Sequence, residues 1–338
     1  MVRAAKQKLI FGKRKMTAIG TFNGYLTAGF PSQINVDVTE FCNLACVHCP
    51  YISVTKPKGK QRTRLSRALH QKLVKEIAED GKSECRFVRY AGEGEPLLHP
   101  FIMEFLTDMK RVGVATALTT NGLLLTEERC RTIVDADVTS VDISLDAHTP
   151  ETYAKIRVGG DLTEAQEGVM RLLSIVKRQN KKLKIMVSFI RQPLNESEAD
   201  DFLSFWKSKG LDYVFIRNLH SCAGQIEDVS RKLWSEAPQK RKPCVYPWER
   251  LVLKPDGKVV FCPADWQHGT AVGDFANTTI KSIWMGKAME DVRDAHFRND
   301  YNKHAFCGKC PDWSVIRWPE EGRSYATAML EIESRKAG

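Results

Sequence analysis

The chain has 338 residues, 43% of them hydrophobic, and a formal net charge of +10. This length and composition suffice for one large domain with a buried core and a second, smaller one. No run approaches the ~20 apolar residues of a membrane span, and basic residues interrupt the N-terminal region where an export signal would lie. We therefore expect a cytoplasmic protein whose clustered cysteines bind metal and do not form disulfides.

Strand-like runs alternate with amphipathic helical patterns along the first two thirds of the chain. The predicted strands are 34–38, 86–91, 115–119, 140–145, 183–190 and 212–217. The predicted helices between them are 68–79, 100–112, 127–136, 164–178 and 196–209. Strands joined by crossover helices form a parallel sheet, so the expected class is α/β. Periodicity alone does not distinguish an open sheet from a curved one.

The alternation ends in a basic, turn-prone stretch that we interpret as a linker between two domains. Beyond it, residues 250–262 alternate around Pro255-Asp256-Gly257, which predicts a β-hairpin. One helix is predicted over residues 280–297 and another in the C-terminal tail. The expected parts are a basic N-terminal arm, a larger domain, the linker, a smaller domain and a terminal helix, at 1–33, 34–221, 222–243, 244–318 and 319–338.

Three cysteines after the first predicted strand give the strongest chemical signal. Cys42, Cys46 and Cys49 are spaced C-x3-C-x2-C, and the next cysteine is Cys85. Three thiolates can hold three corners of a [4Fe-4S] cluster and leave the fourth iron open to bind a substrate, whereas ordinary ferredoxin clusters have four Cys ligands. A structural zinc site is the alternative, but such sites usually take four protein ligands.

This run resembles the cluster motif of the radical S-adenosylmethionine (SAM) enzymes, with His48 where many members carry an aromatic residue. Further segments match the family in the same order along the chain, namely Gly92 to Pro100, Thr119 to Gly122, Ser144 to Asp146, and Arg157. The family usually has Gly-Gly-Glu-Pro in the first of these segments. Here Glu93 replaces the first glycine, while Gly94, Glu95 and Pro96 are kept.

The resemblance implies a partial (β/α)6 TIM-like barrel with its chemistry at the carboxyl ends of the strands. It implies that Cys42, Cys46 and Cys49 hold a [4Fe-4S] cluster whose open iron binds SAM. Reductive cleavage of SAM then yields a radical that removes a hydrogen atom from the substrate, while the protein supplies orientation. The residues expected to bind the cofactor are His48, Gly94, Glu95, Asn121, Ser144 and Arg157.

Four further cysteines follow the linker in the spacing C-x17-C-x44-C-x2-C: Cys244, Cys262, Cys307 and Cys310. The pattern is similar to the twitch domain, a shortened relative of the SPASM domain that holds one auxiliary [4Fe-4S] cluster. Full SPASM domains need additional cysteines for a second cluster, and none follows Cys310. The resemblance thus implies a small C-terminal iron–sulfur domain. Four thiolates also suit a structural zinc, which stays open as the alternative.

Two residues near the end of the sixth predicted strand are candidates for catalysis. Cys222 lies where some radical SAM epimerases place a thiol that returns a hydrogen atom, although a buried cysteine is often only a packing residue. Arg217 shares a strand face with Tyr213 and Phe215. If that face is the barrel interior, Arg217 needs an anionic partner, because a buried lone guanidinium is costly. A substrate carboxylate or phosphate and an internal salt bridge are both open.

The positive charge is uneven. No acidic residue precedes Asp37, and residues Lys56 to Arg64 carry only positive charges. Such a run is often merely a solvated face. A basic rim would also attract an acidic electron donor such as flavodoxin or ferredoxin, or an anionic small-molecule substrate such as a phosphorylated or nucleotide-linked sugar. No RNA-binding module accompanies the charge, so nucleic acid is not the expected partner.

The resemblance to twitch-domain dehydrogenases predicts oxidation of a secondary alcohol of a sugar or aminocyclitol, with the auxiliary cluster as electron acceptor. Epimerisation of a sugar through Cys222 is one alternative. Peptide modification is another, although many such relatives have an N-terminal recognition domain and only 41 residues precede Cys42 here. A non-catalytic iron–sulfur protein would need no SAM site, so the matches at Glu95, Asn121 and Ser144 count against it.

Overall fold

One mixed sheet of nine strands runs through the molecule in the order β6-β5-β4-β3-β2-β1-β7-β8-β9. The computed structural model describes residues 29–50, 61–239, 241, 243–267 and 269–315. Most of the predicted N-terminal arm, the predicted C-terminal helix, and Lys56, Lys58 and Lys60 lie outside these ranges. Among the described residues, no helix combines the length and apolar character that a membrane span requires.

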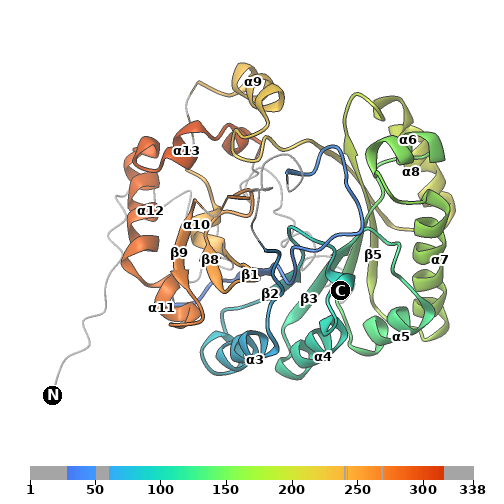
Figure 1. Cartoon of the computed structure of the whole chain (residues 1–338), viewed down its shortest axis with the longest axis horizontal. Coiled ribbons are helices and arrows are strands. Elements are labelled where there is room, and N and C mark those ends of the chain that lie inside the picture. The colour runs from blue at the N-terminus through green and yellow to red at the C-terminus, as the bar shows by residue number, and fades with distance from the viewer. Residues whose placement is uncertain (1–28, 51–60, 240, 242, 268, 316–338) are drawn as a thin grey trace, which may run out of the picture.

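Six parallel strands form the larger part of the sheet, as the alternating pattern predicted. They are β1 Gln33–Val36, β2 Phe87–Tyr90, β3 Ala115–Thr120, β4 Ser140–Ser144, β5 Lys184–Arg191 and β6 Tyr213–Asn218. Their crossover helices are α3 Arg67–Glu76, α4 Ile102–Val112, α5 Glu127–Asp135, α7 Leu162–Arg178 and α8 Ala199–Ser208. Figure 1 shows these helices along the outer face of the curved sheet. Because β6 and β9 are its two ends, the sheet is not closed, and the expected partial barrel is confirmed.

Local signals in the sequence explain where several of these elements begin and why the strands are central. The side chains of Ser66, Thr126 and Asp161 each accept a backbone N–H bond at the start of α3, α5 and α7. All of β1 is buried, because parallel strands in such folds are covered on both faces. Because these six strands are parallel, their carboxyl ends lie at one edge of the sheet, where the loops that carry the cysteine and glycine motifs begin.

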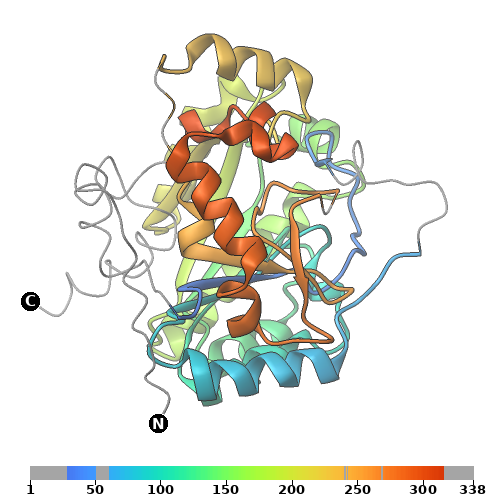
Figure 2. The same ribbon diagram turned by 90° about the vertical axis from the view of Figure 1, so that its left-hand side faces the viewer.

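The C-terminal cysteine region extends this same sheet. Strand β7 Arg250–Leu253 pairs in parallel with β1, and β8 Lys258–Val260 returns antiparallel to it, which confirms the predicted hairpin. Strand β9 Ala271–Asp274 adds the last edge. Figure 2 shows this region from its own side. Local periodicity could not reveal the β1–β7 pairing, because it reports the conformation of a segment and not its partner.

The structure differs from the predicted helices in two ways. The single helix predicted over 280–297 is wrong: α11 Ile280–Trp284 and α12 Lys287–Arg298 are separate. Gly286 begins α12 in an extended conformation, and a Cβ there would lie 2.8 Å from the Ser282 carbonyl oxygen.

The described residues also form α-helices that were not predicted. These are α6 Pro150–Ile156, α9 Glu227–Glu236 within the proposed linker, and two short helices, α10 Tyr246–Glu249 and α13 Ala305–Lys309. Helix α10 follows Cys244 and α13 contains Cys307.

A buried ion-pair cluster joins the C-terminal region to the barrel. Nζ of Lys254, just after β7, donates to Oδ2 of Asp37 and Oε1 of Glu93, each at 2.8 Å. All three side chains are buried. Burial opposes the charge on Lys254, but the two carboxylates outweigh it and raise its pKa. Glu93, the departure from the family glycine, is therefore part of this junction.

We predict that Lys254→Met lowers the melting temperature of the reconstituted protein by at least about 5 °C. Removing Lys254 leaves two buried carboxylates without their shared cation, a change that typically costs about 3–5 kcal/mol. The matched control is Lys258→Met on the same hairpin, because its ion pair with Asp274 lies at the surface, where water screens it and it contributes little to stability. Anaerobic calorimetry gives both values, and equal melting temperatures for the two variants would refute the prediction.

Candidate functional site

The loop that carries the first three cysteines leaves β1 and is fixed from two sides. The N–H groups of Ala45 and Val47 donate to the carbonyl oxygens of Val158 and Ile156, at 2.9 and 3.0 Å. On the other side, the N–H of Glu95 donates to the carbonyl of Phe41 at 2.8 Å. The backbone around the cysteines is thus held to the segments after α6 and after β2, as a preorganised metal site requires.

The carboxylate of Glu95 ties two motifs together beneath this loop. It accepts hydrogen bonds from the Thr120 hydroxyl at 2.7 Å and from the N–H groups of Asn121 and Leu97 at 2.8 and 3.0 Å. Burial raises the pKa of Glu95, and these donors counteract the rise. Asn121 continues the network, because its Nδ2 donates to Oδ1 of Asn43 inside the cysteine loop at 2.8 Å.

Close backbone contacts explain which glycines the motif needs. A Cβ on Gly94 would lie 2.3 Å from the Phe41 carbonyl oxygen, so no side chain fits there. Gly92 has φ of +148°, and a Cβ on it would lie 2.1 Å from Oδ1 of Asp37. Glu93, between them, has no positive φ and reaches Lys254. The family glycine is therefore dispensable at position 93 in this chain.

Asp146 organises a second group of charged residues beside the cysteines. Both Nε and Nη2 of Arg157 donate to its Oδ2, the former at 2.9 Å, and Nη1 of Arg157 lies 3.6 Å from Sγ of Cys46. Nε2 of His48 lies 3.3 Å from the same Asp146 oxygen. Burial lowers the pKa of His48 to about 4 although Asp146 opposes the shift, so this ring is neutral at pH 7.

The sequence-predicted cofactor residues converge on this region. His48, Gly94, Glu95, Asn121 and Arg157 contact the cysteine loop or its immediate supports, as described above. Ser144 ends β4, two residues before Asp146, and pairs in register with Ser188 of β5. Their contacts with SAM stay predictions. Sequence reasoning missed Asp146 as a site residue, although it completes the Ser-Leu-Asp segment and has an unusual positive φ of 62°.

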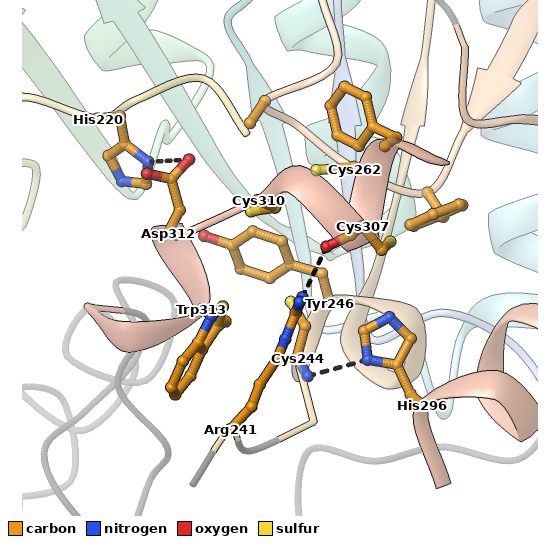
Figure 3. Close-up of a pocket in the computed structure, with 13 residues that line it drawn as sticks. His220, Arg241, Cys244, Tyr246, Cys262, His296, Cys307, Cys310, Asp312 and Trp313 are labelled. Carbon is orange, nitrogen blue, oxygen red and sulfur yellow. Dashed lines mark hydrogen bonds and ion pairs between the residues drawn. The ribbon is translucent and has the colours of Figure 1, made fainter. Parts of the chain in front are cut away.

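The four C-terminal cysteines line one pocket, which we call the auxiliary pocket (Figure 3). Its empty space, which includes some open solvent, is about 450 Å³, and its wall includes Tyr246, Phe261, Phe306 and Trp313. Burial raises the pKa of Cys307 to about 11 and that of Cys310 to about 12, so without a metal these thiols are protonated at pH 7 and cluster assembly must displace their protons. Four thiol ligands in one enclosed pocket fit a fully ligated [4Fe-4S] cluster.

Two buried aspartates shape the chain around this pocket, and no sequence pattern indicated either. Asp265 accepts hydrogen bonds from Gly269 and from both donors of Thr270, which closes the loop after Cys262. Asp312 lies two residues after Cys310 in the chain. It accepts from the N–H and hydroxyl of Ser221, at 2.9 and 2.8 Å, and from the N–H of Ala223 at 2.7 Å. Asp312 thereby fastens the auxiliary pocket to the chain that leaves β6.

Cys222 lies in this fastened loop, between Ser221 and Ala223, which both donate to Asp312. Both Cys222 and Ala223 adopt the left-handed conformation, at φ of 52° and 58°, which non-glycine residues rarely adopt. The Cys222 thiol is buried. Burial raises its pKa to about 12, and the charges of Asp312, Cys49 and Cys310 add to the effect. One short loop is therefore within electrostatic reach of a cysteine from each set.

Arg217 has an internal partner. Its Nη2 donates to Oδ2 of Asp142 on β4 at 3.0 Å, and its guanidinium lies 5.3 Å from the Phe215 ring centre. About a third of the Arg217 side chain, 34%, remains exposed. The internal salt bridge that the sequence left open is thus formed. Contact with a substrate stays a prediction.

The described part of the basic loop packs beside the first cysteine motif. The guanidinium of Arg64 lies 3.7 Å from the centre of the Phe41 ring, and that of Arg62 lies 5.8 Å from it. The N–H of Leu65 donates to the Val38 carbonyl at 2.8 Å. At least these two positive charges therefore lie against the residue that precedes Cys42.

Two family models match the chain. The one described as the radical SAM superfamily matches residues 36–203, and the one described as an iron-sulfur cluster-binding domain, SPASM, matches residues 244–311. The second range includes all four cysteines of the auxiliary pocket. These matches assign a SAM-binding [4Fe-4S] cluster and an auxiliary iron–sulfur cluster, and the zinc alternatives lose their support.

The curated relatives match over about half of the chain. The GTP 3′,8-cyclase of Limosilactobacillus fermentum is 29% identical over 187 residues, which are 54% of this chain and 53% of that protein. The GTP 3′,8-cyclase of Alkaliphilus metalliredigens is 28% identical over 186 residues, 54% of this chain and 55% of that protein. The chain thus spans about half the length of the curated relatives it matches.

Solved structures resemble the chain over a longer range. BtrN in complex with AdoMet and 2-DOIA covers 84% of this chain and 94% of its own, with a TM-score of 0.56 and 18% identity. Native anSMEcpe with bound AdoMet covers 77% and 82%, with a TM-score of 0.57 and 14% identity. Streptococcus suis SuiB bound to precursor peptide SuiA covers 94% and 77%, with a TM-score of 0.63 and 11% identity. At these identities the likeness shows the fold alone.

We predict that anaerobically reconstituted protein holds about eight irons in two [4Fe-4S] clusters. Replacing Cys42, Cys46 and Cys49 together by Ala should remove about four irons and all reductive cleavage of SAM, because the open iron is lost. Iron analysis and the yield of 5′-deoxyadenosine measure the two effects. A well-loaded wild type with about four irons, or with zinc, would contradict the two-cluster assignment.

Two control variants separate cluster loss from misfolding. Replacing Cys307 and Cys310 by Ala should remove the other ~4 irons and leave SAM cleavage, because those thiols belong to the auxiliary pocket. Cys130→Ala should keep about eight irons, since this thiol is buried in α5, where it lies against the Leu125 carbonyl.

Proposed function

We propose that this chain, which belongs to the radical SAM superfamily, oxidises a secondary alcohol of a sugar or aminocyclitol. When bound, SAM and its cluster supply the 5′-deoxyadenosyl radical that takes a hydrogen atom from the carbinol carbon. Cys244, Cys262, Cys307 and Cys310 would hold the auxiliary cluster, which would supply an acceptor for one electron of the substrate radical. With the hydroxyl proton passed to a base, the products would be a ketone, 5′-deoxyadenosine and methionine. The protein positions the substrate and keeps water out.

One observation carries this proposal: the 221–224 loop is hydrogen-bonded to Asp312, two residues after Cys310 in the chain. The thiol of Cys222 in this loop is within electrostatic reach of Cys49 from the first cysteine set and of Cys310 from the second. A substrate beside this loop would have the radical source and an electron acceptor at hand. Because four cysteines line the auxiliary pocket, its cluster has no iron left for substrate and suits electron transfer.

The relatives leave other substrates to be tested. The structural neighbour BtrN is described with AdoMet and 2-DOIA, which favours a small polyol ring. The curated relatives are GTP 3′,8-cyclases, but they match over about half of their length and of this chain. SuiB is described with a precursor peptide, so peptide modification remains the third branch.

Epimerisation is the second candidate, because the buried Cys222 thiol is within electrostatic reach of a cysteine from each set. A thiol at that position would return a hydrogen atom to the substrate radical and invert the carbon.

For electron delivery, we propose that the rim formed by Arg62 and Arg64 attracts an acidic donor such as flavodoxin or ferredoxin.

We predict that holoenzyme with SAM and a reductant transfers deuterium from a ring-deuterated sugar or aminocyclitol to 5′-deoxyadenosine. The substrates to be tested are free, phosphorylated and nucleotide-linked hexoses and aminocyclitols. Deuterated GTP and short deuterated peptides are tested separately, as the alternative substrate classes. Mass spectrometry should show a product that has lost two hydrogens. Transfer of deuterium from GTP or a peptide alone would refute the proposed substrate class.

Oxidation and epimerisation respond differently to Cys222→Ala. Oxidation should survive this change, because the electron acceptor is the cluster of the auxiliary pocket and no hydrogen atom returns. In deuterated water, an epimerase would place solvent deuterium on carbon through the exchangeable thiol. Carbon-bound deuterium that disappears in Cys222→Ala would overturn oxidation in favour of epimerisation.

We also predict that Arg217→Lys keeps SAM cleavage but lowers the ratio of product to 5′-deoxyadenosine at least about tenfold. The proposed reason is that the guanidinium of Arg217 holds a carboxylate or phosphate of the substrate through two N–H groups, and lysine cannot reproduce that paired contact. The conservative change keeps the charge opposite Asp142. Arg191→Lys at the exposed end of β5 is the control and should leave the ratio unchanged. Wild-type coupling in Arg217→Lys would limit Arg217 to the internal salt bridge.

A further inference from the structure

Three buried hydrogen-bond donors in the wall of the auxiliary pocket have no acceptor among the described residues. Arg241 Nε, His296 Nε2 and Trp313 Nε1 are buried nitrogens of pocket-lining side chains, and none has a hydrogen-bond partner among the described residues. A buried donor without an acceptor costs about 1–3 kcal/mol. Three such donors around one pocket indicate that their acceptor is what the pocket binds.

The tautomer of His296 is fixed by its surroundings. The backbone N–H of Cys244 donates to Nδ1 of His296 at 3.1 Å, so this nitrogen carries a lone pair and no proton. The ring is therefore neutral, and its hydrogen is on Nε2, the buried atom without a described partner. Figure 3 shows the ring joined to Cys244 at the edge of the pocket. A cysteine ligand thus orients a donor toward its own site.

Arg241 is anchored beside the same cysteines. Its Nη2 donates to the Cys307 carbonyl oxygen at 2.8 Å, and its guanidinium lies 4.0 Å from the centre of the Tyr301 ring. In Figure 3 the guanidinium ends next to Cys244. Two neighbours hold its plane, so Nε has a fixed direction. Arg241 also brings a positive charge to a pocket whose four thiols become anionic on metal binding.

Trp313 supplies the third donor from the other end of the domain. It follows Cys310 by three residues in the turn Asp312–Ser314 and is buried. An indole nitrogen can only donate, so Nε1 needs an acceptor, and none is found among the described residues. Arg241 precedes Cys244 by three residues, so two of the donors flank the outermost cysteine ligands in sequence.

We propose that these three N–H groups donate hydrogen bonds to the sulfur atoms of the auxiliary cluster and thereby raise its reduction potential. Reduction makes a cluster more negative, and hydrogen bonds from oriented donors stabilise that state more than the oxidised one. Hydrogen bonding to sulfur is one of the means by which a protein sets cluster potential. A higher potential makes the cluster a better electron acceptor, a consequence that rests on the proposed oxidation, whereas the hydrogen bonds do not.

The test measures the auxiliary-cluster potential in reconstituted holoenzyme without substrate, by redox titration followed with EPR. The protein lacking Cys42, Cys46 and Cys49 assigns the auxiliary signal. Trp313→Phe removes one N–H and keeps the aromatic wall. We expect the one-electron reduction constant to fall about tenfold, or ~59 mV, per lost hydrogen bond. Arg241→Lys keeps the positive charge and removes the Nε donor, so the reduction potential of the auxiliary cluster should also fall in this variant.

Trp234→Phe, on the exposed face of α9, is the matched control and should leave the potential unchanged. Fully loaded Trp313→Phe and Arg241→Lys with the wild-type potential would overturn the proposal. A second readout covers variants that fail to hold iron. In deuterated water, the reduced wild-type cluster should show ENDOR couplings to exchangeable deuterons, and their absence would also overturn it. Neither readout needs a substrate, so the proposed oxidation can fail independently.

Discussion

The parallel pairing of β1 with β7 is the constraint on which the arrangement of the site depends. Strand β1 ends in the loop of Cys42, Cys46 and Cys49, while β7 belongs to the hairpin that ends at Cys262. Hydrogen-bonded neighbours in a sheet lie about 5 Å apart, so this pairing places Lys254, at the carboxyl end of β7, beside Asp37 at the carboxyl end of β1. The antiparallel β8 then returns the chain toward the other edge of the sheet before Cys262. Had the C-terminal hairpin formed its own sheet, a flexible linker would have set the separation of the clusters.

Buried charges hold the C-terminal region against the barrel at two places. Lys254 neutralises Asp37 and Glu93 where β7 meets the barrel, and Asp312 fastens the auxiliary pocket to the exit of β6. Each carboxylate is buried and would be costly without its donors, so the contacts specify one relative position of the two parts. The same rigidity holds Cys222 and Ala223 in a left-handed conformation that an isolated loop would leave.

The two cysteine sets differ in their polar surroundings, in a way that suits different tasks. Cys46 has a guanidinium, that of Arg157, whose charge is shared with Asp146. The wall of the auxiliary pocket instead has an arginine, a neutral imidazole and an indole whose buried nitrogens have no hydrogen-bond partner among the described residues. A site with an open iron needs room for its cofactor, whereas a fully ligated cluster can be enclosed and tuned by its wall.

The amino-acid sequence by itself determined the α/β alternation, both cysteine sets, and most of the residues around the first set. Those features depend on local periodicity and on ligand spacing within short segments, which a linear pattern records directly. The helix break at Gly286 was not predicted because helical periodicity continues across it. The role of Glu93 was not predicted because its partner Lys254 is distant in sequence. Only the tertiary structure decided that β7 joins β1, that Asp142 pairs with Arg217, and that the donors of Arg241, His296 and Trp313 surround one pocket. Each of these depends on which distant segments meet, and partner choice is set by packing of the whole chain.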